Sequence, residues 1–267
     1  MPDVLEFAIA TARAAGQLLC QLYRQHHSVR LKSSNIDVVT EADLASEQLI
    51  VDAIRQEFPG HGIFSEEGLG DVHALVADST PVWLVDPLDG TVNYAHGYPL
   101  WGVSLALSEG GQILTAVTFD PVRDEVFSAQ QGKGAWYNGG ERIQVSGVTE
   151  MRQALVATGF PYKRATLVDN NMPEFSAVMP RVQGVRRAGA AVLDLAHLAG
   201  GRLDGYWEMH LRPWDWAAGW LLVEEAGGKV TDIRGRPWSL ASNEIVASNG
   251  PLHEEFLAHL VQARQQG

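Results

Sequence analysis

The sequence predicts a layered α/β protein with an antiparallel-rich N-terminal half and an α/β C-terminal half. Three observations support this class: helical apolar spacing opens the chain, a meander of short apolar runs fills its middle, and helices then alternate with strands. The 267 residues, of which 46% are hydrophobic, suffice for one large domain or two small ones with a sizeable core. We expect an N-terminal half of 1–150 and a C-terminal half of 151–267 that pack as one compact unit.

The N-terminal region predicts two helices. Over 3–25, apolar residues recur at the spacing of one helical face. The run 38–60 predicts a second helix, for which Thr40 is a suitable cap and Pro59 marks the end.

The middle of the chain predicts an antiparallel sheet built as a meander. A short and fully apolar strand is expected at 82–86, and the Asn138-Gly139 pair is typical of a hairpin turn. Further strands are expected at 101–108, 113–120, 125–130 and on both sides of that turn.

Beyond about residue 150 the apolar pattern alternates between helical and strand spacing, which indicates an α/β half. The predicted order is strand 154–159, helix 169–182, helix 190–201, strand 203–208, helix 214–228, strands 229–232 and 244–249, and a helix from Pro251.

The charge and composition exclude several classes of protein. A formal net charge of -12 disfavours direct nucleic-acid binding, because phosphate backbones attract basic surfaces. The single cysteine, Cys20, excludes a disulfide framework and a thiolate metal site. The N-terminus lacks a signal-peptide pattern and no apolar run is long enough to span a membrane, so we expect a cytoplasmic protein without membrane contact.

Acidic residues stand at the ends of four predicted elements, and each has a structural alternative. The Asp86/Asp89 pair follows the strand at 82–86, where Asp-Gly is also a common turn. Asp43 fits either a capping box with Thr40 or a catalytic carboxylate, and this choice stays open. The other two are Glu66 with Glu67, which suit a solvated loop, and Asp215, which suits a helix cap.

A cation site explains why these carboxylates share such positions. Loop-borne sites are assembled from segment ends on a rigid scaffold. Mg²⁺ takes oxygen ligands, commonly one or two carboxylates together with substrate phosphate and water. The segment Asp86-Pro87-Leu88-Asp89-Gly90-Thr91 offers carboxylates, a carbonyl and a hydroxyl within six residues.

Two longer motifs resemble those of the inositol monophosphatase family. They are WLVDPLDGTVNY, from residue 83, and WDWAAGWLLVEEAGG, from residue 214, and they stand in the family's order. KSSNIDVVTEAD, SEEG and GAAVLDLAHLAGGRLDGYWE are similar to the family's other segments, so the resemblance covers nearly the whole chain. It implies an αβαβα sandwich of the sugar-phosphatase type.

The resemblance also implies a role for individual residues. Two or three Mg²⁺ would be held by Glu66, Asp86, the Leu88 carbonyl, Asp89 and Asp215. Asp43, Thr91 and Glu66 would be catalytic, with Thr91 and Asp43 orienting and helping to deprotonate the attacking water. Substrate contacts would come from Gly90, Thr91, Gly189, Ala190, Ala191, Glu208 and Asp215, with Lys32, Asp37 and Arg212 as outer positions.

The function implied is Mg²⁺-dependent hydrolysis of a small phosphate monoester, with inositol 1-phosphate as the leading candidate. Fructose-1,6-bisphosphatase, histidinol-phosphatase and nucleotide 3′-phosphatase activities remain alternatives, because a fold does not select a substrate. A protein-binding role with the transcription machinery is an alternative of another class. The resemblance further implies lithium sensitivity and a homodimer.

One residue departs from the family pattern. Ala190 stands where many members carry Ser or Thr, which puts sugar selectivity in doubt but not phosphate hydrolysis. Arg212 could favour a second anionic group on the substrate.

Overall fold

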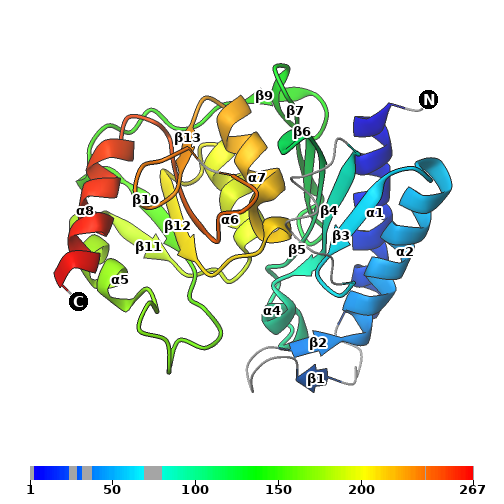
Figure 1. The fold of residues 1–267 in the computed structure, drawn as a ribbon, viewed down its shortest axis with the longest axis horizontal. Coiled ribbons are helices and arrows are strands. Elements are labelled where there is room, and N and C mark those ends of the chain that lie inside the picture. The colour runs from blue at the N-terminus through cyan, green and yellow to red at the C-terminus, as the bar shows by residue number, and fades with distance from the viewer. Residues whose placement is uncertain (1–2, 24–28, 32–37, 69–79, 238, 267) are drawn as a thin grey trace.

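The fold was analysed in a computed structural model that describes residues 3–23, 29–31, 38–68, 80–237 and 239–266. It contains a seven-stranded sheet, a five-stranded sheet and a two-stranded ribbon, with helices on the faces of the two larger sheets (Figure 1). No helix in these ranges is long and apolar enough to cross a membrane.

The seven-stranded sheet confirms the predicted meander. Its strand order is β3-β4-β5-β6-β7-β8-β9, and every pair is antiparallel except β3 and β4. The strands are β3 (Gly62–Ser65), β4 (Val82–Asp89), β5 (Gly102–Glu109), β6 (Gln112–Asp120), β7 (Glu125–Gln130), β8 (Gly134–Tyr137) and β9 (Glu141–Ile143).

The five-stranded sheet lies in the C-terminal half and has the order β11-β10-β12-β14-β13. The central strand β12 is parallel to β10 and antiparallel to β14. The strands are β10 (Leu155–Thr158), β11 (Gly184–Arg186), β12 (Gly205–Met209), β13 (Lys229–Thr231) and β14 (Glu244–Ser248), and the separate ribbon pairs β1 (Val29–Leu31) with β2 (Val38–Thr40).

Helices cover both faces of the two sheets and give five layers (Figure 1). Helices α1 and α2 cover the outer face of the seven-stranded sheet, α6 and α7 lie between the sheets, and α5 and α8 cover the outer face of the five-stranded sheet. The helices are α1 (Val4–Leu22), α2 (Glu41–Glu57), α4 (Thr91–Ala95), α5 (Met172–Val178), α6 (Ala191–Ala199), α7 (Pro213–Glu225) and α8 (His253–Gln266), with 3₁₀ turns η1 (Met151–Gln153) and η2 (Met179–Arg181).

The core follows the same layers. The largest apolar cluster joins α6 and α7 to both sheets and contains Phe64, Leu195, Tyr206 and Trp216. This cluster therefore contains side chains from both halves of the sequence.

Three expected elements differ from the structure. The helix expected from residue 38 begins at Glu41, because 38–40 pair as strand β2 instead. The helix expected over 169–182 divides into α5 and η2. The strand expected at 82–86 continues to Asp89, so no turn separates Asp86 from Asp89.

Candidate active site

An irregularity in β4 brings Asp86 and Asp89 to one face of the sheet. Asp86 pairs with Ser104 of β5, while Asp89 pairs with Gly102, so three steps along β4 match two along β5. Residues three apart in a regular strand point to opposite faces. The extra residue cancels that alternation, which is the effect of a β-bulge.

Hydrogen bonds hold the chain between these two aspartates. The Leu88 N–H donates to Asp86 Oδ1 at 3.1 Å, and the Ser46 hydroxyl of α2 donates to the Pro87 carbonyl at 2.7 Å. The Thr91 hydroxyl oxygen lies 3.1 Å from the Leu88 carbonyl oxygen, which is one of two acceptors within its reach. The segment predicted to carry ligands is therefore fixed from both sides.

Gly90 allows the chain to turn into α4 beside the C-terminal half. Its φ is +88°, and a Cβ built there would lie 3.1 Å from the Leu100 carbonyl oxygen and 3.3 Å from that of Gly189. Both the left-handed backbone and the close approach favour glycine.

Asp43 completes the capping box and also contacts Thr91, so the cap does not exclude a catalytic role. One oxygen, Oδ2, accepts the Thr40 N–H at 2.9 Å and the Thr40 hydroxyl at 2.5 Å, which completes the capping box of α2. The other oxygen, Oδ1, accepts the Thr91 hydroxyl at 3.0 Å. The carboxylate is fully buried, so its two oxygens serve the helix and the site separately.

Glu66 follows β3 at the same end of the sheet. Its N–H lies 3.3 Å from the Val85 carbonyl oxygen, one residue before Asp86. The preceding Ser65 hydroxyl donates to Glu47 of α2, which fixes the start of this loop. The negative charge of Glu66 raises the pKa of both Asp86 and Asp215, so the three carboxylates share one electrostatic environment.

The N-terminus of α6 completes this side of the site. The Val192 N–H donates to Asp89 Oδ2 at 2.8 Å, where the helix dipole also favours negative charge. The Asn93 amide donates to the Ala188 carbonyl at 2.9 Å and so ties 188–191 to α4. Ala190 is fully buried, and its methyl group packs in the core.

Asp215 and Glu208 come from the second family motif and the strand before it. Asp215 lies in the first turn of α7, where its Oδ2 accepts the Arg212 N–H at 2.7 Å. Glu208 lies on β12, and its carboxylate accepts a hydrogen bond from Tyr206. The Arg212 side chain is exposed.

The electrostatics of these carboxylates favour a cation. Burial, followed by neighbouring carboxylates that include Glu66, raises the pKa of Asp86 and of Asp215 well above the ordinary value. Burial likewise raises the pKa of Asp89 to about 7. Within the described residues these three aspartates form no ion pair with a basic side chain.

A divalent cation would lower these raised pKa values, because opposite charge nearby stabilises ionised carboxylates. The donors are all oxygen atoms, and they include a main-chain carbonyl at Leu88, which is the ligand chemistry of Mg²⁺. The residues present therefore fit such an ion.

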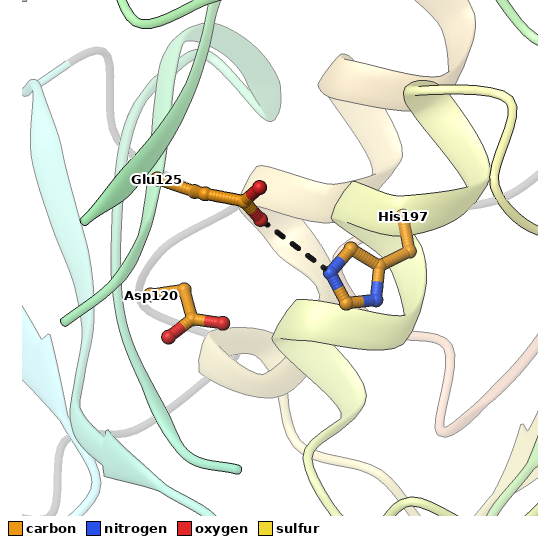
Figure 2. Close-up of side chains that lie close together, drawn as sticks. All are labelled: Asp120, Glu125 and His197. Atoms are coloured by element: carbon orange, nitrogen blue, oxygen red, sulfur yellow. Dashed lines mark ion pairs between the residues drawn. The ribbon is translucent and has the colours of Figure 1, made fainter. Parts of the chain in front are cut away.

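A second acidic cluster escaped the sequence analysis. Asp120, Glu125 and His197 each offer a ligand atom within 4.8 Å of the others, so the group could hold a metal ion (Figure 2). Arginines already occupy both carboxylates: Arg123 donates to Asp120 at 2.7 Å, and Arg202 makes a two-bond pair with Glu125. Burial lowers the pKa of His197 to about 4, so the ring is neutral. A cation here would have to displace existing ion pairs.

The structure describes all of the predicted site residues except two. Around the bulge and the N-terminus of α6 it gathers Asp86, Leu88, Asp89, Gly90, Thr91, Asp43, Gly189, Ala190 and Ala191, and electrostatic coupling places Glu66, Glu208 and Asp215 beside them. Lys32 and Asp37 lie outside the described residues. The sequence analysis missed Asp194, which couples electrostatically to Glu208 and Asp89; its signal was a lone carboxylate within the apolar run of α6.

Comparisons with known proteins show the family of the chain. The model of the Inositol monophosphatase family matches residues 1–266. An inositol-1-monophosphatase from Synechocystis is 40% identical over 263 residues, covering 98% of this chain and 90% of that protein. A protein named Nus factor SuhB from Pseudomonas aeruginosa is 42% identical over 252 residues, covering 93% of this chain and 92% of that protein.

Solved structures give the same result. The inositol monophosphatase from Anabaena superposes with a TM-score of 0.85 at 42% identity, covering 97% of this chain and 95% of that one. An inositol monophosphatase from Thermotoga maritima gives 0.89 at 34% identity, covering 99% of both chains. With a family match over nearly its whole length and the predicted layered fold, the chain belongs to the inositol monophosphatase family and is a phosphatase.

Proposed function

We propose that the protein hydrolyses a small phosphate monoester with Mg²⁺, and that inositol 1-phosphate is its substrate. The observation that carries this proposal is the group of Asp86, Asp89 and Asp215, which are coupled to Glu66 and have no basic partner among the described residues. Family membership supports the reaction class, and the Synechocystis relative carries the substrate in its name.

The proposed metal ligands divide into two sets. Glu66, Asp86 and the Leu88 carbonyl would hold one ion, and Asp86, Asp89 and Asp215 a second, and the family resemblance implies two or three ions in total. When bound, Mg²⁺ lowers the pKa of water and offsets the charge on the phosphate oxygens.

The protein's own groups would then orient the water and remove its proton. The Thr91 hydroxyl lies between two acceptors, Asp43 Oδ1 at 3.0 Å and the Leu88 carbonyl at 3.1 Å. Because its hydrogen is directed to one of them, the Thr91 oxygen is left to accept a hydrogen bond from the attacking water. Asp43 Oδ1 is the base at the end of this path, while Oδ2 stays bonded to Thr40.

Three further groups would position the substrate. The Gly90 and Thr91 N–H groups would donate to the phosphate, while the Glu208 carboxylate would accept hydrogen bonds from the hydroxyls of the leaving alcohol. Phosphoryl transfer depends mainly on such positioning and charge stabilisation.

A panel of phosphate monoesters tests the substrate assignment. Phosphate release with Mg²⁺ would be ranked by kcat/KM for inositol 1-phosphate, fructose 1,6-bisphosphate, histidinol phosphate and a nucleoside 3′-phosphate. Inositol 1-phosphate should rank first, and a higher kcat/KM for any of the others would replace it as the substrate. Absence of Mg²⁺-dependent release from all four would refute the proposed function.

A second candidate is a protein-binding role in transcription. Relatives from Pseudomonas aeruginosa and Escherichia coli, 42% and 39% identical, are named Nus factor SuhB. The acidic net charge of -12 suits protein contacts better than nucleic acid. Co-elution of purified RNA polymerase with both the wild type and the inactive Asp86→Asn variant would support this role, and loss of co-elution with both would exclude direct binding to the polymerase.

The family resemblance also supports a cytoplasmic homodimer that Li⁺ inhibits. Sedimentation at micromolar concentration distinguishes a dimer from a 29.1 kDa monomer, and a Li⁺ titration of phosphate release tests the inhibition.

A further inference from the structure

Glu208 has a neighbour on its own strand that nothing above assigns to the site. Tyr206 and Glu208 are two apart on β12, so both side chains face the layer of α6 and α7. Tyr206 is fully buried, and its hydroxyl donates to Glu208 Oε2. Because β12 is the central strand of its sheet, Tyr206 is paired on both sides, with β10 and β14, and Glu208 is paired with Ile245 of β14.

The other side of the Glu208 carboxylate rests against the backbone at Gly159. A Cβ built on Gly159 would overlap all three atoms of the carboxylate, so only glycine leaves room for it. The Gly159 carbonyl accepts the Asn171 amide at 2.6 Å, and Asn171 Oδ1 accepts the Trp207 indole N–H at 2.6 Å. The wall behind Glu208 is thus bonded back to β12 itself.

Charged groups around this pair explain why the tyrosine acts as a donor. Burial, together with the charges of Glu208 and Asp194, raises the pKa of Tyr206, so its hydroxyl keeps its proton. Arg187 is the cation that acts on Glu208, where it lowers the pKa that burial raises. The charge of Asp89 also raises the pKa of Tyr206.

We propose that Tyr206 is a positioning residue that sets selectivity for polyol phosphates by holding Glu208 Oε2 and leaving Oε1 to the hydroxyls of the substrate. The proposal rests on the proposed function, in which Glu208 accepts those hydroxyls. A carboxylate that accepts a hydrogen bond on one oxygen and packs against the Gly159 backbone presents its second oxygen in a fixed direction. A carboxylate without these contacts loses that preorganisation. The phosphate is bound elsewhere, so the effect is confined to the alcohol part of the substrate.

The variant Tyr206→Phe removes the hydroxyl and keeps the ring. With inositol 1-phosphate, KM should rise about tenfold, as expected for loss of a hydrogen bond to a charged group, while kcat changes less than about twofold. With p-nitrophenyl phosphate, which has no hydroxyl for Glu208, both constants should stay at wild-type values. Equal losses on the two substrates would show a merely structural role, and no change on either would overturn the proposal.

A second variant reaches the same carboxylate from its other side. Gly159→Ala displaces Glu208 by overlap, so it should raise KM for inositol 1-phosphate and spare p-nitrophenyl phosphate. Tyr137→Phe is the matched control, because Tyr137 donates to Glu125 at 3.1 Å in the other acidic cluster. It should leave both substrates unchanged.

The variant Glu208→Gln distinguishes the positioning role of Tyr206 from the proposed contact between Glu208 and the substrate. If Glu208→Gln raises KM for inositol 1-phosphate and Tyr206→Phe does not, the positioning role is wrong and the substrate contact stands. If Glu208→Gln changes neither substrate, the contact itself is wrong and the role of Tyr206 falls with it. If both hold, the double variant should lose no more than Glu208→Gln alone, because the tyrosine acts through the carboxylate.

Discussion

Replacement of Asp43 by asparagine separates helix capping from catalysis in one residue. In the wild type, Oδ2 serves Thr40 and Oδ1 accepts the Thr91 hydroxyl. An asparagine has one oxygen, which can still accept the Thr40 N–H. Its amide then faces Thr91, whose hydroxyl can donate to the Leu88 carbonyl at 3.1 Å instead.

This rearrangement keeps a partner for the Thr40 N–H, the Thr91 hydroxyl and one of the two asparagine N–H bonds, so the loss of stability should be small. Loss of a cap costs about 1 kcal/mol, and for a chain of this size that shifts Tm by about 2–4 °C. Catalysis should suffer more, because no carboxylate oxygen remains to take the proton. We expect kcat to fall well over tenfold, on the order of 10²-fold, while KM changes little.

The assay is Mg²⁺-dependent phosphate release together with thermal unfolding. Thr40→Ala is the matched control, because it removes the capping hydroxyl and leaves Asp43 and Thr91 in place. It should lower Tm by a similar amount with kcat within about twofold of wild type. A near-wild-type kcat in Asp43→Asn would reduce Asp43 to a helix cap and refute its catalytic role.

Three further variants test the rest of the site. Asp86→Asn should lower kcat at least about 10²-fold while the chelated protein keeps or gains stability, since clustered like charges repel; unfolding of the metal-free variant would contradict this. The pKa of Asp89 in the folded protein is about 7, above its ordinary value of 3.8. Ionisation of Asp89 therefore destabilises the chelated protein as pH rises from 3.8 through about 7. The Tm of Asp89→Asn relative to wild type should increase from pH 5 to pH 8. His197 has the opposite effect on the pH dependence of stability, because burial lowers its pKa. The comparison with wild type cancels this effect. Glu125→Gln should cost about 1 kcal/mol of stability by weakening the Arg202 pair, with no change in the Mg²⁺ requirement; a shifted requirement would place the metal in that cluster.

The local pattern of the sequence was enough for most elements but not for the short ones. Apolar spacing identifies the meander and the α6 to β12 to α7 succession, because each of these elements buries a continuous face. Strands β3 and β11, with four and three residues, are defined by pairing to distant neighbours rather than by periodicity. The five residues of α4 are likewise too few to show a helical period.

The sequence indicates a set of candidate site residues but not their geometry. A motif shows that Asp86 and Asp89 are three apart, and only the β5 register shows the bulge that turns them to one face. The choice between cap and catalyst at Asp43 could not be made because it depends on how two oxygens of one carboxylate are shared. Glu125 and Arg202 are far apart in the chain, so no local sequence pattern predicts their ion pair.

The most direct test of a metal-dependent active site at Asp86, Asp89 and Asp215 is phosphate release after chelation. Wild-type protein treated with EDTA should lose hydrolysis of inositol 1-phosphate and regain it when Mg²⁺ is added in excess. Addition of Mg²⁺ should not restore the Asp86→Asn variant. Unchanged turnover in the chelator, or full restoration of the variant, would contradict the assignment of these carboxylates as ligands of the catalytic metal.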